Sequence, residues 1–143
     1  MIEIVRAVPG TLDFNACLAI RMEVFVQEQK VPANEELDAY DETAIHMLAR
    51  VNTQPAGTAR AIEKAPGLWK IGRVAVRASY RQQGIGLALM QAIESTCPAR
   101  QFILSAQVHA LRFYEKQGYK AEGPVFGEAG LAHRLMRKAA SAS

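Results

Sequence analysis

Residues 71–94, IGRVAVRASYRQQGIGLALMQAIE, decide how the rest of the chain can be arranged. The stretch opens with three β-branched residues that a buried strand favours, Ile71, Val74 and Val76. Gly84 and Gly86 come next and permit a tight loop. Apolar residues then recur at helical spacing up to Pro98, which ends the pattern. The stretch therefore predicts a strand, a glycine loop and a helix in succession.

A glycine loop that leads into a helix can bind an anion, because the first amides of a helix lack partners and the helix dipole favours negative charge. Arg81 adds a positive charge at the edge of the loop. A P-loop is poorly supported, since Leu87 and Ala88 stand where that motif needs lysine and serine or threonine. A dinucleotide loop would need a third glycine at Leu89. The residues alone leave open a phosphate-binding loop and a plain turn.

The composition is that of one globular domain, which we expect at residues 1–138, with a loose tail at 139–143. The net charge of +3 includes no basic block, so nucleic acid is not expected as a partner. The apolar runs are too short to cross a membrane and no secretory signal opens the chain, which favours a cytoplasmic protein. Cys17 and Cys97 occupy apolar helical positions and are expected to be buried free thiols.

Residue patterns predict seven strands along the chain. They are expected at residues 2–8, 44–51, 57–63, 68–76, 101–107, 119–125 and 131–138. Helices are expected from a Thr11 cap to about Val24, from the glycine loop to Pro98, and at 110–117 before Gly118. Short turns make the second, third and fourth strands an antiparallel meander, whereas the helix between the fourth and fifth requires those two strands to run parallel. The sheet is therefore expected to be mixed.

Residues 27–42 interrupt this regular pattern. Pro32 and Asn34 break it, and we expect an irregular loop. Five carboxylates gather in the segment, those of Glu35, Glu36, Asp38, Asp41 and Glu42. The segment is either a solvated connection or a negative wall that attracts a cationic substrate.

Two motifs relate the chain to a known family. Arg-x-x-Gly-x-Gly at 81–86, after Val-Ala-Val, resembles the coenzyme A pyrophosphate loop of the GCN5-related N-acetyltransferases, the GNAT family. The segment ALRFYEKQGY at 110–119 is similar to the family's A-x-x-F-Y-x-x-x-G-F/Y segment, which packs along the pantetheine arm. Residues 21–29 and 128–133 are similar to small stand-alone bacterial members of the ElaA and YjcF type. The order of expected elements agrees with this family over nearly the whole chain.

The resemblance implies an α+β fold, with a mixed, mostly antiparallel, twisted sheet of seven strands flanked by about four helices. The central parallel strands should splay apart at the cofactor site. The implied reaction moves an acetyl group from acetyl-coenzyme A to a primary amine by direct attack in a ternary complex, with no metal. The acceptor would be a small molecule or a protein amine, and the exposed edge strands are compatible with a homodimer.

The resemblance also implies the cofactor site. The backbone of residues 74–76 should pair with the pantetheine amides, and an N–H near Val76 should face the developing oxyanion. The expected cofactor-binding residues are Val74, Ala75, Val76, Arg81, Gln82, Gln83, Gly84, Ile85, Gly86, Leu87, Gln107, Ala110, Phe113 and Tyr114. Tyr114 is the candidate acid for the departing thiolate, because a phenol with a pKa of about 10 keeps its proton at neutral pH. Alternatively, its ring only packs beside Phe113.

The sequence does not identify the general base. Some family members use a glutamate on the strand before the glycine loop, but this strand carries Lys70 and Arg73. His46 and His133 titrate in the useful range and are the next candidates, although strand histidines are often structural. Weaker candidates are Glu36, Asp38 and Glu128. A water chain that ends on several of these groups is equally consistent with the family.

Two functions of other classes stay open. One is a non-catalytic domain that binds or senses acyl-coenzyme A; the missing strand carboxylate favours it, whereas Tyr114 and the acidic segment argue against it. The other is a generic phosphate or nucleotide binder. The absence of a P-loop lysine and of an Asp/Glu cluster for Mg²⁺ after the strand argues against this second function.

Overall fold

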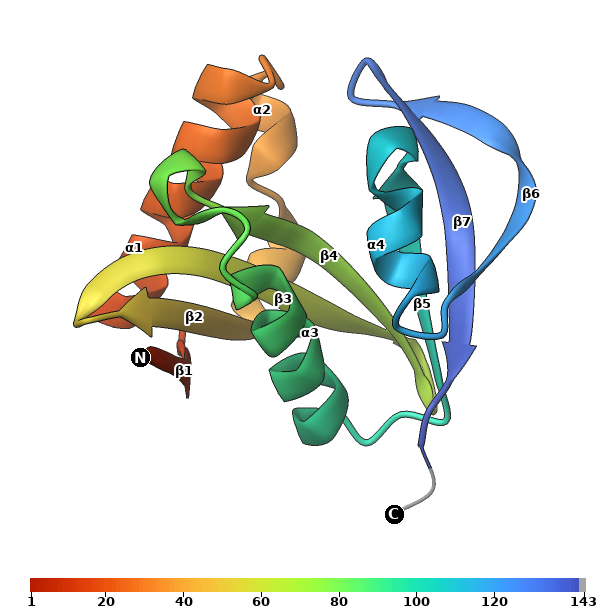
Figure 1. Ribbon diagram of the computed structural model, residues 1–143, viewed down its shortest axis with the longest axis horizontal. Helices are drawn as coiled ribbons and strands as arrows, with labels where there is room; N and C mark the ends of the chain where they lie inside the picture. The colour runs from red at the N-terminus through yellow and green to blue at the C-terminus, as the bar shows by residue number, and fades with distance from the viewer. Residues whose placement is uncertain (142–143) are drawn as a thin grey trace.

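The computed structural model describes residues 1–141 of the chain. Its strands are β1 (Ile2–Arg6), β2 (Ile45–Val51), β3 (Gln54–Ala65), β4 (Leu68–Val76), β5 (Gln101–Gln107), β6 (Lys120–Glu128) and β7 (Leu131–Ala139). Its α-helices are α1 (Leu12–Arg21), α2 (Ala33–Glu36), α3 (Ile85–Thr96) and α4 (Leu111–Glu115) (Figure 1). Shorter helical segments are the π-helix η1 (Met22–Glu28) and the 3₁₀ turns η2 (Ala39–Glu42), η3 (Ala78–Tyr80) and η4 (Val108–Ala110).

The seven strands form one sheet in the order β1-β2-β3-β4-β5-β7-β6. Strands β4 and β5 run parallel, and the other neighbouring strands run antiparallel. In Figure 1, β2, β3 and β4 lie with α1 and α3 on one side of the molecule, and β5, β6 and β7 lie with α4 on the other. The expected mixed, mostly antiparallel sheet with a central parallel pair is confirmed.

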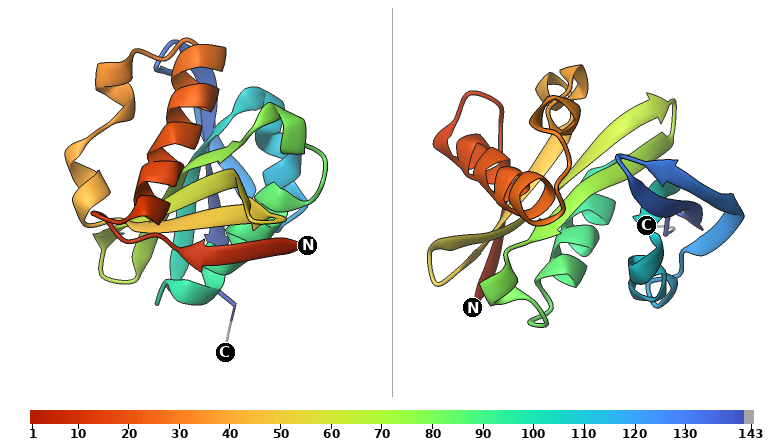
Figure 2. Two further views of the ribbon diagram at one scale, coloured as in Figure 1. Left: turned by 90° about the vertical axis from the view of Figure 1, so that its left-hand side faces the viewer. Right: turned by 90° about the horizontal axis from the view of Figure 1, so that it is seen from above.

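Helices α1 and α3 cover opposite faces of the first half of the sheet (Figure 2). Side chains alternate along a strand, so Met47 faces the cluster that contains Leu89 of α3. The next residue, Leu48, faces the cluster that contains Cys17 and Ile20 of α1. All five side chains are buried. The two apolar layers fix β4 between the helices.

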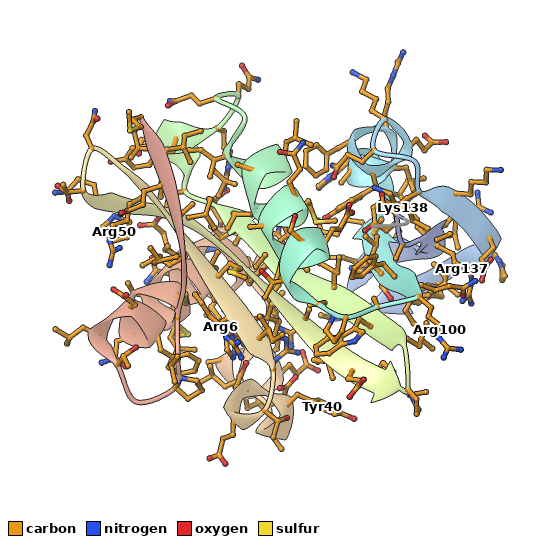
Figure 3. All side chains as sticks on the ribbon, turned by 90° about the horizontal axis from the view of Figure 1, so that it is seen from below. Arg6, Tyr40, Arg50, Arg100, Arg137 and Lys138 are labelled. Carbon is orange, nitrogen blue, oxygen red and sulfur yellow. The ribbon has the colours of Figure 1, made fainter. Side chains whose placement is uncertain are left out.

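The second half of the sheet is tied to α3 by polar contacts. Glu94 of α3 accepts hydrogen bonds from the Tyr119 hydroxyl at 2.7 Å and from Nζ of Lys138 at 2.9 Å. Figure 3 shows Lys138 on the C-terminal half of the molecule, away from Arg50 in the N-terminal half. These hydrogen bonds hold β7 beside α3.

Several boundaries differ from the sequence prediction for local reasons. Asn52 and Thr53 both have positive φ, so a tight turn lets β3 begin at Gln54. The helix expected to end near Val24 continues as the π-helix to Glu28. Strand β7 includes Ala139, the first residue of the expected tail, whereas residues 142–143 of that tail lie outside the described part.

The acidic segment is more ordered than the expected irregular loop. It contains α2 and η2, and the Asp38 side chain caps η2 by accepting a hydrogen bond from the Tyr40 N–H at 3.1 Å. Asp41 completes a capping box with Asp38. Across residues 1–141, no helix combines the length and apolar character that a membrane crossing requires.

Candidate functional site

The parallel strands separate part-way along their length. Ile71 and Leu104 form the last pair, although β4 continues to Val76 and β5 to Gln107. The register between β3 and β4 shifts at this level, and Arg73 of β4 has a φ of +52°. Such a bulge bends a strand and increases its twist. The expected splay of the central pair is confirmed.

A backbone edge of β4 faces the gap between the splayed strands. The Arg77 N–H donates to the carbonyl of Ala56 at 2.9 Å, on the β3 side. Backbone groups alternate in direction along an antiparallel strand, so Val76 directs its N–H and C=O toward the gap. The Val76 carbonyl accepts a hydrogen bond from Nε of Arg81 at 2.9 Å. The Val76 N–H is thus available to a ligand in the gap.

Free amides gather where the loop enters α3. Gly84 is the N-cap residue, with a φ of +80° and no side-chain capping bond. The first bond of the helix joins the Ala88 N–H to the Gly84 carbonyl at 3.0 Å. Among residues 1–141, no hydrogen-bond acceptor pairs with the amides of residues 85–87. These amides lie at the positive end of the helix dipole, which is the arrangement that an anion site requires.

Arg81 is engaged by a residue that the sequence interpretation did not single out. Its guanidinium donates two hydrogen bonds to the Glu28 carboxylate of η1, at 2.8 and 2.7 Å. The hydrogen bonds with Arg81 lower the pKa of Glu28, and those with Glu28 raise the pKa of Arg81. The positive charge expected at the loop edge is therefore present, but a carboxylate neutralises it.

A cavity of about 450 Å³, here called the loop cavity, lies against the start of α3. Its lining residues are Val74, Val76, Tyr80, Arg81, Gln82, Gly84, Ile85, Gly86, Leu87, Ala110, Phe113 and Tyr114. Most expected cofactor-binding residues are in this set. Gly86 lets Phe113 pack closely, because a Cβ at this position would lie 3.2 Å from the Phe113 ring and the ring would have to shift slightly.

Three of the expected cofactor-binding residues do not line the loop cavity. The Ala75 side chain is buried in the α1 layer. The Gln83 side chain is exposed and donates to the Ser79 carbonyl at 3.4 Å. Gln107 lines a second cavity, where its side-chain amide donates to the Gln29 side chain at 2.9 Å.

The second cavity, here called the sheet cavity, has a volume of about 580 Å³ and lies between η1, α2 and strands β3, β4, β5 and β7. Val74, Ala110 and Tyr114 line both cavities. The two cavities therefore meet beside the splayed strands. A ligand held by the loop cavity can present one end to the sheet cavity at this junction.

Tyr114 lies on α4 at the junction. Its side chain is buried between the rings of Phe113 and Tyr119, with ring centres 4.9 and 6.1 Å away. Burial raises the pKa of Tyr114 to about 12. The hydroxyl therefore keeps its proton at neutral pH and can donate a hydrogen bond to an anion that forms nearby.

The two candidate histidines lie in different surroundings. His133 lines the sheet cavity, and its Nδ1 lies 2.8 Å from the Leu131 carbonyl. A proton on Nδ1 donates to that carbonyl, which leaves the lone pair on Nε2, 3.7 Å from Oε2 of Glu128. His46 lines neither cavity; its Nε2 lies 2.8 Å from the Asp41 carbonyl, and burial lowers its pKa. The structure thus brings His133, and not His46, to the junction side of the sheet.

Three carboxylates of the acidic segment have arginine partners. Arg21 binds Glu36 at 2.7 Å and Asp41 at 2.8 Å, and Arg60 binds Asp41 at 2.7 Å and Asp38 at 2.8 Å. Glu36 and Asp41 are buried. These contacts contradict both expectations for the three carboxylates, since they neither form a solvated connection nor present free negative charge. Nothing in the sequence around these carboxylates indicated that Arg21 and Arg60 would be their partners.

No group of three or more His, Cys, Asp and Glu side chains within the described part of the chain is arranged to hold a metal ion. Cys17 and Cys97 are buried free thiols. Burial raises the pKa of each thiol, to about 11 for Cys97, so neither resembles a reactive thiolate.

The sequence model of an acetyltransferase (GNAT) domain matches residues 14–140. The chain belongs to the GNAT family. It is 38% identical over 123 residues to YjcF, an uncharacterised N-acetyltransferase of Bacillus subtilis (strain 168), with 83% of this chain and 87% of that protein covered.

Two solved structures agree with this assignment. An acyl-CoA N-acyltransferase from Pseudomonas aeruginosa has 32% identity and a TM-score of 0.84, with 97% and 100% of the two chains covered. ElaA from Escherichia coli has 30% identity and a TM-score of 0.85, with 96% and 99% covered. The resemblance to GNAT members of the ElaA and YjcF type is confirmed.

Proposed function

We propose that this GNAT protein is an acetyl-coenzyme A-dependent N-acetyltransferase, which transfers the acetyl group to a primary amine by direct attack in a ternary complex. The observation that carries the proposal is the meeting of two cavities at Val74, Ala110 and Tyr114. One cavity borders free helix amides, and the other contains a histidine with an available lone pair. Acetyl-coenzyme A, when bound, supplies an acetyl group activated as a thioester.

The loop cavity has the donors that a pyrophosphate needs. The amides of residues 85–87 and the dipole of α3 favour a negatively charged group at the N-terminus of the helix. Arg81 can add charge when it exchanges Glu28 for the phosphate oxygens. The apolar side chains of Val74, Val76 and Phe113 suit the pantetheine arm, and the β4 edge offers backbone groups to its amides.

Three groups near the two cavities carry out the proton transfers and the charge stabilisation that this reaction requires. Nε2 of His133 accepts the proton of the incoming ammonium, and Glu128 stabilises the imidazolium that results. The Val76 N–H donates to the thioester carbonyl oxygen, which is worth roughly 3 kcal/mol of barrier if the donor is preorganised. The Tyr114 hydroxyl protonates the thiolate that leaves.

The test separates binding from catalysis. Isothermal titration with coenzyme A, ATP and NAD should give heat of binding with coenzyme A at micromolar levels and much weaker binding of the other two. Release of free thiol from acetyl-coenzyme A should then depend on an added primary amine. Binding of coenzyme A without amine-dependent thiol release would instead support a non-catalytic acyl-coenzyme A-binding domain.

A further inference from the structure

The ionised groups beside the sheet cavity fall into two sets. The first is a connected set of three arginines and three carboxylates, namely Arg21, Arg60, Arg73, Glu36, Asp38 and Asp41. Because the positive and negative charges of this set are equal in number, it adds little net charge to the cavity. The charge that an acceptor meets must therefore come from the remaining groups.

The second set has unneutralised cations at one end of the cavity. Lys70 lines the cavity from β4 and is partly buried. Lys64 lines it from the adjacent β3, with Nζ 4.9 Å from the ring centre of Tyr40, which Figure 3 shows on η2. Within residues 1–141, Lys138 forms an ion pair, whereas Lys64 and Lys70 do not. Lys70 thus makes this end of the cavity positive, and the solvent-exposed Lys64 adds a weaker, screened contribution.

The opposite end of the cavity contains the group suited to an amine. Glu128 lies 3.7 Å from His133, so this end offers a carboxylate and an imidazole lone pair. Glu35 also lines the cavity, but its side chain is exposed to solvent, as is that of Lys64, so the partly buried Lys70 is the main cation of the cavity. The cavity is therefore polarised, with the cations near the start of β4 and the proton acceptor near the turn between β6 and β7.

The strand register indicates how far apart Lys70 and His133 lie. Lys70 is paired with Ile103 of β5, and His133 is paired with Gln107, four residues further along the same strand. Four residues of a strand span about 13 Å, and because β4 and β7 flank β5 the two residues are also separated by about 10 Å across the sheet. Both residues line the sheet cavity, which lies over this part of the sheet. Gly72 leaves the floor open, since a Cβ there would meet nothing within 4 Å. A short molecule can therefore reach both ends.

We propose that the acceptor is a short primary amine that also carries an anionic group, and that Lys70 binds this anionic group while the amine is directed to His133. This substrate class rests on the proposed function, because it describes the acceptor of that reaction. A polycationic amine is disfavoured, since its second charge would lie against Lys64 and Lys70. The buried carboxylates do not compensate, because their arginine partners already neutralise them.

The test compares three primary amines of similar length, 4-aminobutyrate, butylamine and putrescine, at saturating acetyl-coenzyme A. We expect kcat/KM to fall in that order. Lys70→Glu should lower kcat/KM for 4-aminobutyrate by about tenfold or more, which corresponds to about 1.4 kcal/mol. The same variant should raise kcat/KM for putrescine and leave kcat/KM for butylamine unchanged. Lys70→Met should give an intermediate loss and guards against misfolding of the charge-reversed variant. Lys120→Glu, on β6 outside both cavities, is the control with the same change of net charge.

The outcomes distinguish this substrate class from the proposed function. A wild-type preference for putrescine, or an equal effect of Lys70→Glu on all three amines, would overturn the role of Lys70. If none of the amines supports thiol release, equilibrium dialysis of 4-aminobutyrate against the protein saturated with coenzyme A decides the matter. Binding that Lys70→Glu removes would support an anion site even without catalysis, whereas no binding would overturn it.

Discussion

Replacing Asp41 with asparagine tests whether the acidic segment stabilises the fold instead of attracting substrate. Asp41 accepts hydrogen bonds from Nη1 of Arg21 at 2.8 Å and Nη1 of Arg60 at 2.7 Å, and its side chain is 11% exposed. Asparagine would leave Arg21 with Glu36 alone and Arg60 with Asp38 alone, so that three arginines face two carboxylates. Breaking a buried charge network in this way costs about 3–5 kcal/mol. This is a large part of the about 5–15 kcal/mol that stabilises a typical domain.

The pKa of Asp41 also shows how much its ionised carboxylate contributes to the free energy of unfolding. Burial alone would raise the pKa, but hydrogen bonds from Arg21 and Arg60 outweigh burial and lower it from 3.8 to about 2. Because the folded-state pKa is depressed, the stabilisation is present above the unfolded value and is lost as the pH falls through about 2. The difference corresponds to about 2.5 kcal/mol, of which about 1 kcal/mol disappears between pH 5 and pH 3.

The assay is urea denaturation followed by circular dichroism at pH 7, 5 and 3. Glu42→Gln is the matched control, because Glu42 is an exposed carboxylate of the same segment. We expect Asp41→Asn to lose about 3 kcal/mol or more at pH 7 and to show a pH dependence about 1 kcal/mol smaller than wild type. A variant whose free energy of unfolding stays within about 0.5 kcal/mol of the control would refute the buried network.

Three further substitutions probe the junction and the loop. Tyr114→Phe should lower kcat by about tenfold or more while the Kd of coenzyme A changes little; unchanged turnover at saturating acetyl-coenzyme A would remove its role as an acid. His133→Gln should lower kcat/KM for the amine by about 100-fold at neutral pH, and an unaltered pH–rate profile would exclude it as the base. Glu28→Gln should free Arg81 and tighten coenzyme A binding a few-fold, because exposed ion pairs are weak. Weaker binding, measured by isothermal titration, would mean that Arg81 does not turn to the phosphates.

Much of the fold could be predicted because its signals are local. Residue alternation identified the strands, and the helix after Gly84 made the fourth and fifth strands parallel. The start of β3 depends on a backbone conformation that a β-branched residue rarely adopts, the positive φ of Thr53. The continuation of α1 into a π-helix has no comparable local signal.

The loop residues of the site could be predicted from the glycine motif. The ion pairs between residues far apart in the sequence could not. The loop residues follow from their position before α3. The partners of Glu36 and Asp41, by contrast, come from α1 and β3, and sequence spacing does not indicate such contacts. His46 and His133 look alike as strand residues. They differ because α1 covers His46, where Phe14 packs on its ring, whereas the sheet cavity opens beside His133.

Binding of coenzyme A at the start of α3 is tested most directly by titrating ¹⁵N-labelled protein with coenzyme A and following the backbone amide chemical shifts. We expect the largest shifts at the free amides of residues 85–87 and at the Val76 N–H, with smaller changes on the α1 layer. Saturation by coenzyme A with the largest shifts elsewhere, and the amides of residues 85–87 unchanged, would contradict binding at this site.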